Sequence, residues 1–254
     1  MKRKEREFMA DSSGDIAVKV ENVSMMFNLS REKVDNLKEY IVRLLKKQLH
    51  FDEFWALSDV SFEVRKGEIF AVMGLNGAGK STLLKTIAGV FKPTRGKVLT
   101  TGLVAPLIEL GAGFDMESTA RENVLMNGAM FGYPPSFIES RYPEIIDFAE
   151  LWDFENVPIK NFSSGMLARL GFAVAVCVEP DILITDEILA VGDYKFQEKC
   201  EGRIRKMLDG GMTVLLVSHS AAVVKNLCSR ALLLDKGIVT AIGTAEEVCA
   251  IYEG

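Results

Sequence analysis

A glycine-rich turn, set between an apolar run and a helical run, constrains the fold of this chain more than any other feature. Residues 68–73 are a glutamate followed by Ile-Phe-Ala-Val-Met, a continuous apolar run typical of a strand buried in a parallel sheet. Residues 74–81 follow with the pattern G-x-x-x-x-G-K-S, and a helix is predicted over residues 80–90. This order of strand, glycine turn and helix predicts an α/β fold with a mostly parallel sheet.

The chemistry of this turn favours a bound triphosphate. Glycines let backbone N–H groups approach phosphate oxygens closely, and the N-terminus of the following helix adds a partial positive charge. Lys80 is predicted to reach the β and γ phosphates, and the Ser81 hydroxyl is predicted to bind Mg²⁺. The predicted ATP-binding residues of this phosphate loop are Gly74, Leu75, Asn76, Gly77, Ala78, Gly79, Lys80, Ser81 and Thr82.

A second apolar strand ends in two adjacent carboxylates. Residues 181–187 read DILITDE, and such a strand delivers its last side chains to the carboxyl edge of the sheet, beside the phosphate loop. Asp186 is predicted to hold the Mg²⁺ shell, and Glu187 to orient or deprotonate the water that attacks the γ-phosphate. An Asp-Glu pair alone is usually a solvated loop charge, so it is the phosphate loop that favours the catalytic interpretation.

A histidine ends a third apolar strand. Residues 213–219 read TVLLVSH, which predicts that His219 lies at a strand tip. There a histidine hydrogen-bonds the γ-phosphate and holds Glu187 and the water in line, so its predicted role is orientation more than proton transfer. A strand-tip histidine is usually structural on its own, and the two preceding motifs favour the catalytic role.

Composition limits the classes of protein that remain. The 254 residues suffice for one large α/β domain or a core with an inserted lobe, and 48% hydrophobic with 26% charged residues leaves no case for extensive disorder. The net charge of -5 argues against a nucleic-acid partner, since proteins that follow phosphate backbones usually carry a basic surface. The four cysteines show no metal-like spacing and are predicted to be reduced apolar fillers.

No segment predicts membrane insertion or secretion. The sequence has no uncharged apolar run of roughly 18 to 20 residues, and residues 1–11 lack the apolar region of a signal peptide. We therefore expect a cytoplasmic protein with a flexible tail over residues 1–15 and one domain over residues 16–254.

Two segments are predicted to be additions to the α/β core. Strands are predicted over residues 16–27 and 54–64, and over residues 28–50 apolar side chains recur at helical spacing among lysines and arginines. This amphipathic helix is interpreted either as a surface helix of its own domain or as a helix presented to a membrane or a permease partner. Residues from about 103 to 176 read mostly as helices and loops, which predicts an inserted helical lobe.

Two short motifs complete a series along the chain. Residues 162–166 (FSSGM) precede a predicted helix, and residues 190–193 (AVGD) follow the carboxylate pair. With the phosphate loop, DILITDE and the Ser-His pair, they resemble in content and order the motifs of ABC transporter nucleotide-binding subunits, from Ile16 to nearly the end of the chain. The resemblance implies the ABC ATPase fold: a P-loop NTPase core, an N-terminal antiparallel β region and an inserted helical lobe that carries the signature motif.

The signature motif of that family is usually LSGGQ, where this chain has FSSGM. The resemblance implies that Ser163 contacts the γ-phosphate, with Ser164 at the position of the first glycine and Gly165 as the close-approach glycine. These residues are expected at the tip of the lobe, so one chain is not expected to bring both them and the phosphate loop onto one ATP. A two-fold homodimer is predicted, with each ATP between Lys80 of one subunit and Ser163 of the other, and with Asp193 coupling the two sites.

Two further roles follow from position in the family pattern. The aromatic side chain that stacks on adenine falls on Phe27, with Phe54 and Trp55 as alternatives. The glutamine that contacts Mg²⁺ and signals to the permease is missing from residues 104–114, and Glu109 lies near its position. Glu109 is interpreted either as its replacement in the metal shell or as a purely structural residue.

Two longer strings narrow the resemblance. Residues 163–176 (SSGMLARLGFAVAV) and 185–200 (TDEILAVGDYKFQEKC) are similar to the exporter ATPases for O-antigen, capsule and teichoic-acid chains, whose extra helix resembles residues 28–50. This implies an ATPase that powers export of a glycan polymer through a separate integral-membrane permease of the ABC-2 type, with about six spans. The permease is expected to dock near residues 109–123, with the chain peripheral on the cytoplasmic face of the membrane.

Three other functions are weighed against this one. A cytosolic ABC-type ATPase that acts on nucleic acid or ribosomes usually has two such domains or long coiled coils, and this sequence shows neither. A regulatory subunit that binds ATP without turnover is disfavoured by Glu187 and His219. An exporter of a lipid or small molecule is opposed only by the two longer strings.

Overall fold

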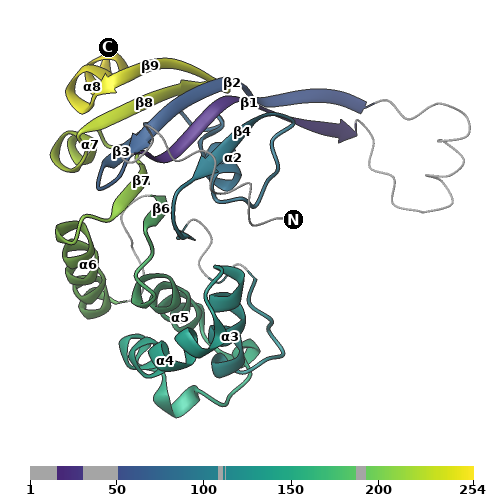
Figure 1. The fold of residues 1–254 in the computed structure, drawn as a ribbon, viewed down its shortest axis with the longest axis vertical. Helices are drawn as coiled ribbons and strands as arrows, with labels where there is room; N and C mark the ends of the chain where they lie inside the picture. The colour runs from purple at the N-terminus through teal and green to yellow at the C-terminus, as the bar shows by residue number, and fades with distance from the viewer. Residues whose placement is uncertain (1–15, 31–50, 108–110, 112, 187–192) are drawn as a thin grey trace, which may run out of the picture.

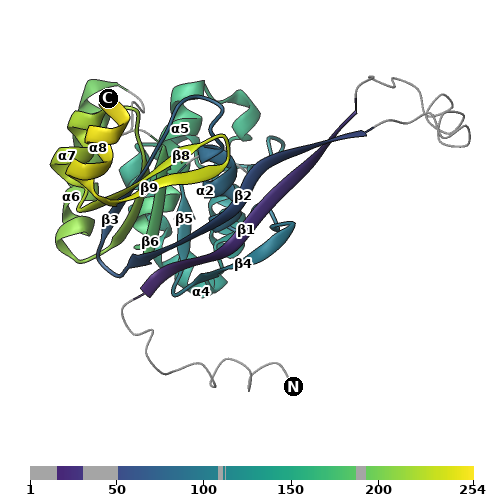
Figure 2. The same cartoon turned by 90° about the horizontal axis from the view of Figure 1, so that it is seen from above.

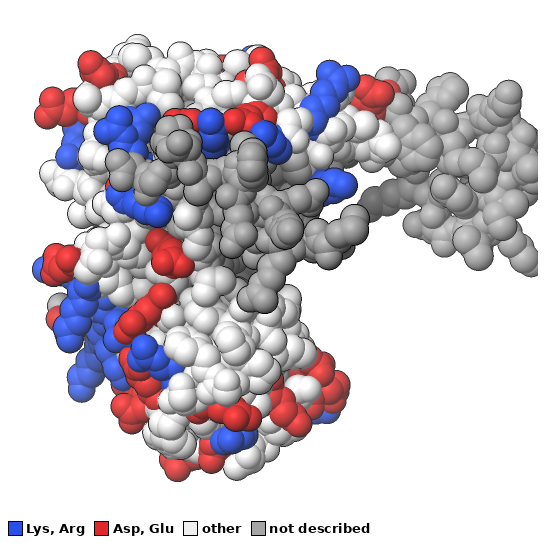
Figure 3. Space-filling model, viewed as in Figure 1, with Lys and Arg blue, Asp and Glu red and all other residues white. Residues whose placement is uncertain are grey.

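The computed structural model describes residues 16–30, 51–107, 111, 113–186 and 193–254, and for residues 29, 30, 51 and 186 it describes the backbone alone. Figure 1 shows an upper α/β part that holds the strands and, below it, a lobe of helices. Figure 3, viewed from the same side, shows charged side chains of both signs on both parts.

The larger sheet has six strands in the order β5-β6-β7-β3-β8-β9. These strands are β3 (Ile69–Met73), β5 (Val104–Pro106), β6 (Ile182–Asp186), β7 (Thr213–Val217), β8 (Arg230–Asp235) and β9 (Ile238–Thr244). All neighbours pair in parallel except β8 and β9, which pair antiparallel. The apolar runs predicted as buried parallel strands therefore form the centre of this sheet, and the predicted fold class is confirmed.

The smaller sheet is antiparallel, in the order β2-β1-β4. Strands β1 (Ile16–Ser30) and β2 (Phe51–Arg65) pair along their whole length, and Figure 2 shows the paired ribbon reaching out beyond the core. Residues 28–30 continue this ladder, so they are strand and not part of the predicted amphipathic helix; residues 31–50 lie outside the described residues. Strand β4 (Arg95–Thr100) was not predicted, because its residues are mostly polar and exposed.

The two faces of β3 pack into different hydrophobic clusters. Phe70 and Val72 join side chains of β1 and β2 and of helix α2 (Lys80–Ile87), which lies against both sheets. Ala71 and Met73, on the opposite face, join the cluster that includes the helical lobe. Successive side chains of β3 therefore pack into the two clusters in turn, so both clusters fix the strand that leads into the phosphate loop.

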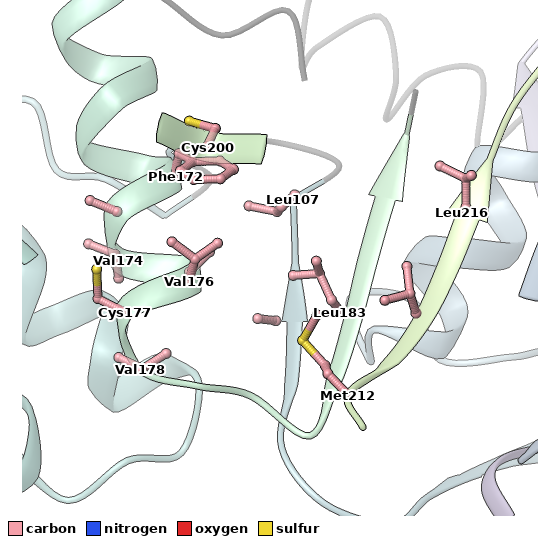
Figure 4. Close-up of a cluster of buried hydrophobic side chains, with 14 of the residues drawn as sticks. Leu107, Phe172, Val174, Val176, Cys177, Val178, Leu183, Cys200, Met212 and Leu216 are labelled. Atoms are coloured by element: carbon pink, nitrogen blue, oxygen red, sulfur yellow. The ribbon is translucent and has the colours of Figure 1, made fainter. Parts of the chain in front are cut away.

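The lobe is built from three helices, α3 (Ala120–Met130), α4 (Pro135–Ala149) and α5 (Ser164–Cys177), with two short 3₁₀ turns, η1 (Trp152–Phe154) and η2 (Ile159–Asn161). Figure 4 shows Phe172 and Val176 of α5 on the side of the helix that faces Leu107 and Leu183. The predicted start of the lobe near residue 103 is too early, because residues 104–106 form β5 and pair with β6.

Three more helices complete the core: α6 (Tyr194–Asp209), α7 (Ala221–Leu227) and α8 (Ala245–Glu253). All four cysteines are free and buried, and burial raises the pKa of the Cys177, Cys200 and Cys228 thiols to about 12. The prediction of apolar filler thiols is confirmed. Within the described part of the chain, no helix combines the length and apolar character that a membrane crossing requires.

Candidate functional site

The phosphate loop leaves β3 at Met73 and enters α2 at Lys80. Gly74 has φ 147°, and a Cβ there would lie 2.2 Å from the Leu234 carbonyl oxygen. Gly79 has φ 104°, and a Cβ there would lie 2.6 Å from the Ala56 carbonyl oxygen. Both glycines are required, since a side chain would collide with backbone on the inner side of the loop.

Lys80 is buried, and its Nζ donates hydrogen bonds to the carbonyl oxygens of Gly74 at 2.8 Å and Leu75 at 2.9 Å. The ammonium is therefore held across the loop that would enclose a phosphate. The first turn of α2 has no acidic residue, and the Ser81 side chain is exposed there. A helix N-terminus with an adjacent buried ammonium is a site for an anion, and the glycine cradle fits the triphosphate of ATP.

Gly237, in the turn between β8 and β9, supports the phosphate loop from behind. Its N–H donates to the Ala78 carbonyl at 2.8 Å, and its own carbonyl accepts from the Ser58 N–H at 2.8 Å. One backbone residue thus joins β2 to the phosphate loop. Sequence reasoning did not single out Gly237; the available signal was the glycine itself, whose φ is 79° and whose Cβ would lie 2.6 Å from the Ala56 carbonyl oxygen.

The carboxyl ends of β6 and β7 lie on the same edge as the loop. Asp186 is paired with Val217, and Val217 with Val72, so Asp186 is level with the end of β3 across two strand spacings, about 10 Å. His219 follows β7 by two residues, and its side chain is exposed. The topology thus gathers the predicted strand-end residues at one edge, while Glu187 lies outside the described residues.

The residues proposed to hold Mg²⁺ have the ligand types that this ion prefers. Ser81 contributes a hydroxyl at the start of α2, and Asp186 contributes a carboxylate at the end of β6. The third predicted ligand, Glu109, lies outside the described residues.

The signature residues lie at the N-terminus of α5, in the lobe. Ser163 is the N-cap, and its Oγ accepts from the Met166 N–H at 3.2 Å; the side chains of Ser163 and Ser164 are exposed. A Cβ on Gly165 would meet only Ser163 Oγ, at 3.8 Å. Packing inside the described part of the chain therefore gives no reason for a glycine at residue 165.

Asp193 is engaged with its own chain. It caps α6 by accepting from the Phe196 N–H at 3.0 Å, and it pairs with the Arg169 guanidinium of α5. The Phe196 N–H first, and then the Arg169 charge, lower the pKa of the Asp193 carboxyl. This residue links the lobe to α6, a role that sequence reasoning missed because the partner is distant along the chain.

The three candidate aromatics divide between two faces of the β1–β2 ribbon. Phe27 lies directly across from Phe54, so these rings share a face, and Phe27 also contacts Phe91 edge-on at 5.7 Å. Trp55, the next residue in β2, points the other way and lies under the Arg95 guanidinium at 4.9 Å. Phe54 is 50% exposed on the face that it shares with Phe27, and the role of these aromatic rings in stacking on adenine stays a prediction.

Known proteins show the same combination of sequence and fold. The family model described as ABC transporter matches residues 57–190. The O-antigen export system ATP-binding protein RfbB of Klebsiella pneumoniae is 47% identical over 201 residues, covering 79% of this chain and 82% of that protein. The teichoic acids export ATP-binding protein TagH of Listeria monocytogenes serotype 4b is 41% identical over 239 residues, covering 94% of this chain and 70% of that protein.

Among solved structures, the dimeric post-hydrolysis state of an ATP-binding cassette bound to ADP and phosphate has a TM-score of 0.66 at 25% identity. It covers 90% of this chain, and this chain covers 98% of it. The strand order, the phosphate loop and these likenesses confirm the family resemblance drawn from the motifs. The chain belongs to the ABC transporter family of ATPases.

Proposed function

We propose that this chain hydrolyses ATP to power export of a polysaccharide, O-antigen or teichoic-acid-like polymer through a separate permease. The single observation that carries the ATPase part is the geometry of the phosphate loop. Two of its glycines have no room for a Cβ, and the Lys80 ammonium donates to two carbonyl oxygens of the loop. The cargo class is supported by relatives named for O-antigen export and teichoic acids export. We assign the ATPase cassette to residues 16–254.

The proposed catalytic roles follow the edge of the sheet. Lys80 binds the β and γ phosphates, while Ser81 and Asp186 hold Mg²⁺, whose charge neutralises the phosphates when it is bound. Glu187 orients or deprotonates the attacking water, and His219 holds that water in line. Asp186 of β6 pairs with Val217 of β7, which lies two residues before His219, so these two residues lie at the same edge of the sheet.

The proposed working unit is a homodimer. Gly165 has no packing reason inside the described part of its own chain, whereas a phosphate from a second copy would need a close approach there. Ser163, Ser164 and Gly165 at the N-terminus of α5 then complete the other subunit's site, aided by the helix dipole. The similar solved cassette is itself a dimer.

A groove between the core and the lobe supports the proposed permease contact. It has a volume of about 610 Å³, and its lining includes Gly111, Gly113 and Met130, the last 62% exposed. Val90, which follows α2, and Phe131, the C-cap of α3, also line it. An apolar helix from a permease of the ABC-2 type, with about six spans, suits this groove and would hold the chain peripherally on the cytoplasmic face.

The first experiment tests nucleotide binding. Lys80→Ala removes charge-assisted hydrogen bonds and should weaken ATP binding by roughly 10- to 150-fold in a fluorescence titration. Lys85→Ala is the matched control, since Lys85 lies one turn along α2, with its ammonium 5.7 Å from the Phe91 ring, and should bind ATP normally. Equal affinities for the wild type and both variants would refute the assignment of the loop.

The second experiment tests the cargo. The chain and its permease are placed in vesicles with a lipid-linked glycan on one side, and ATP-dependent arrival of glycan on the other side is measured. The proposal is supported if transport is lost in Glu187→Gln and also lost when the lipid carries no glycan. Equal transport of the lipid without its glycan assigns the chain to lipid export, while loss of all turnover in Glu187→Gln still supports the ATPase assignment.

A further inference from the structure

A second cavity lies between the large sheet and helix α6, and none of its lining residues belongs to the phosphate loop. Its volume is about 270 Å³. Leu183, Val214 and Leu216 form its floor on neighbouring strands β6 and β7, and Ile204 and Leu208 of α6 form its roof. The interior of this cavity is therefore almost entirely apolar.

The cavity exists because α6 lies close to its neighbours over only its first half. Phe196 and Cys200 on its inner side are 1% and 0% exposed. Ile204 and Leu208, one and two turns further along the same stripe, are only partly buried although the sheet residues opposite them are fully covered. The second half of the helix therefore leaves space above the sheet.

One buried polar group, the Thr185 hydroxyl, lines this space. Thr185 is 5% exposed, its side chain lies on the same face of β6 as Leu183, and its neighbour on β7 is Leu216. Thr185 Oγ1 is buried and has no hydrogen-bond partner among the described residues. A valine of the same shape would avoid this unfavourable burial, so the hydroxyl calls for a partner that the described residues do not supply.

We infer that this cavity binds a small neutral molecule with an apolar body and one hydroxyl group. The apolar floor and roof accept the body, and Thr185 Oγ1, which both donates and accepts, pairs with the hydroxyl. The volume lies just below the 300 to 1,000 Å³ range of drug-sized sites and above the roughly 150 Å³ that holds benzene. The charged side chains in the lining, Glu201 and Arg205, are exposed and remain hydrated.

The position of Thr185 links this cavity to the nucleotide site through strand β6. Thr185 directly precedes Asp186, which ends β6 at the edge where the phosphate loop lies. Resting on the proposed ATPase function, occupation of the cavity is expected to change ATP turnover by shifting the end of β6. Binding itself does not depend on that function, so it is measured first and without nucleotide.

The test uses the full chain with p-cresol and p-xylene, which have nearly the same shape and differ in a hydroxyl replaced by a methyl group. Methyl NMR is expected to show p-cresol shifting the Leu183, Leu216 and Ile204 signals, with p-xylene binding about five-fold more weakly. Thr185→Val should remove this preference for p-cresol. Thr213→Val is the control and should keep the preference, because the Thr213 hydroxyl accepts from the Gly67 N–H outside the cavity.

Further variants separate the outcomes. Leu208→Phe fills the cavity and should abolish binding of both ligands; if it does not fold, the Thr185→Val comparison decides alone. Lys80→Ala should bind p-cresol as the wild type does, so a failed ATPase assignment would leave this result intact. The inference is overturned if no signal shifts up to the solubility limit, if the shifts fall in the groove beside Met130, or if Thr185→Val still prefers p-cresol.

Discussion

Replacing Gly237 by alanine tests whether the β8–β9 turn positions the phosphate loop. The left-handed φ of 79° costs an alanine about 1 to 2 kcal/mol. Its Cβ would also lie 2.6 Å from the Ala56 carbonyl oxygen and 3.1 Å from the Leu57 Cα, both backbone atoms that yield only if β2 moves. Such overpacking typically costs about 1 to 3 kcal/mol, so the free energy of unfolding should fall by about 2 to 5 kcal/mol.

Gly211→Ala is the matched control for backbone strain. Gly211 has a φ of 82°, but its Cβ would meet no atom within 4 Å, so only the conformational cost of about 1 to 2 kcal/mol applies. The difference between the two variants in free energy of unfolding, measured with urea, is therefore the cost of the clash between the new Cβ at residue 237 and the backbone of β2.

Nucleotide affinity separates positioning from general stability. The Gly237 N–H holds the Ala78 carbonyl, so moving this turn removes a backbone hydrogen bond from the phosphate loop. At temperatures where both variants are fully folded, Gly237→Ala should raise the ATP dissociation constant at least about five-fold, and Gly211→Ala should leave it unchanged. Equal losses of stability with wild-type affinity in both variants would refute the reasoning.

Three further predictions concern single side chains. Gly165→Ala should leave the stability of the monomer unchanged or raise its free energy of unfolding by up to about 1 kcal/mol, because alanine favours the helix and its Cβ meets only Ser163 Oγ, at 3.8 Å. Sedimentation of the same variant should nevertheless show weaker ATP-dependent dimerisation. Phe27→Ala should weaken binding of ATP roughly 5- to 150-fold but not that of tripolyphosphate, which has no base to stack, and a larger effect from Phe54→Ala would move the stacking role to that ring. The pKa of the Asp193 carboxyl is lowered from 3.8 in the folded protein. Its stabilising contribution is therefore present above pH 3.8 and is lost as the pH falls through the lower folded pKa. Asp193→Asn should be less stable than the wild type in urea at pH 7 and equally stable in strong acid.

The central sheet could be predicted because its signals are local. The apolar runs at β3, β6 and β7 each bury both faces, and each run ends in the residues that the phosphate chemistry needs. Parallel pairing then brings Asp186 and His219 to one edge without further information, since all carboxyl ends of a parallel sheet lie on the same side. The fold class followed from these patterns, whereas the family came from the resemblance of the motifs and their order.

What the sequence did not reveal depends on partners that are distant along the chain. Strand β4 has an exposed, mostly polar sequence and is strand only because β1 offers it an edge. Strand β5 is three residues long and is fixed by pairing with β6. The roles of Gly237 and Asp193 likewise come from Ala78 and Arg169, and neither contact leaves a periodic pattern in the sequence.

The contacts of Arg169 connect the two halves of the proposed dimer site within one chain. Its guanidinium lies on α5, binds the Glu150 carboxylate at 2.8 Å, pairs with Asp193 and lies 4.9 Å over the Phe196 ring. The Arg169 side chain is 21% exposed, whereas the side chains of its partners Glu150 and Asp193 are 54% and 60% exposed. A rotation of α5 that brings Ser163 toward another subunit's nucleotide must therefore also move the N-cap of α6. We therefore expect a movement of the lobe to reach the N-terminus of α6 through the contact between Arg169 and Asp193.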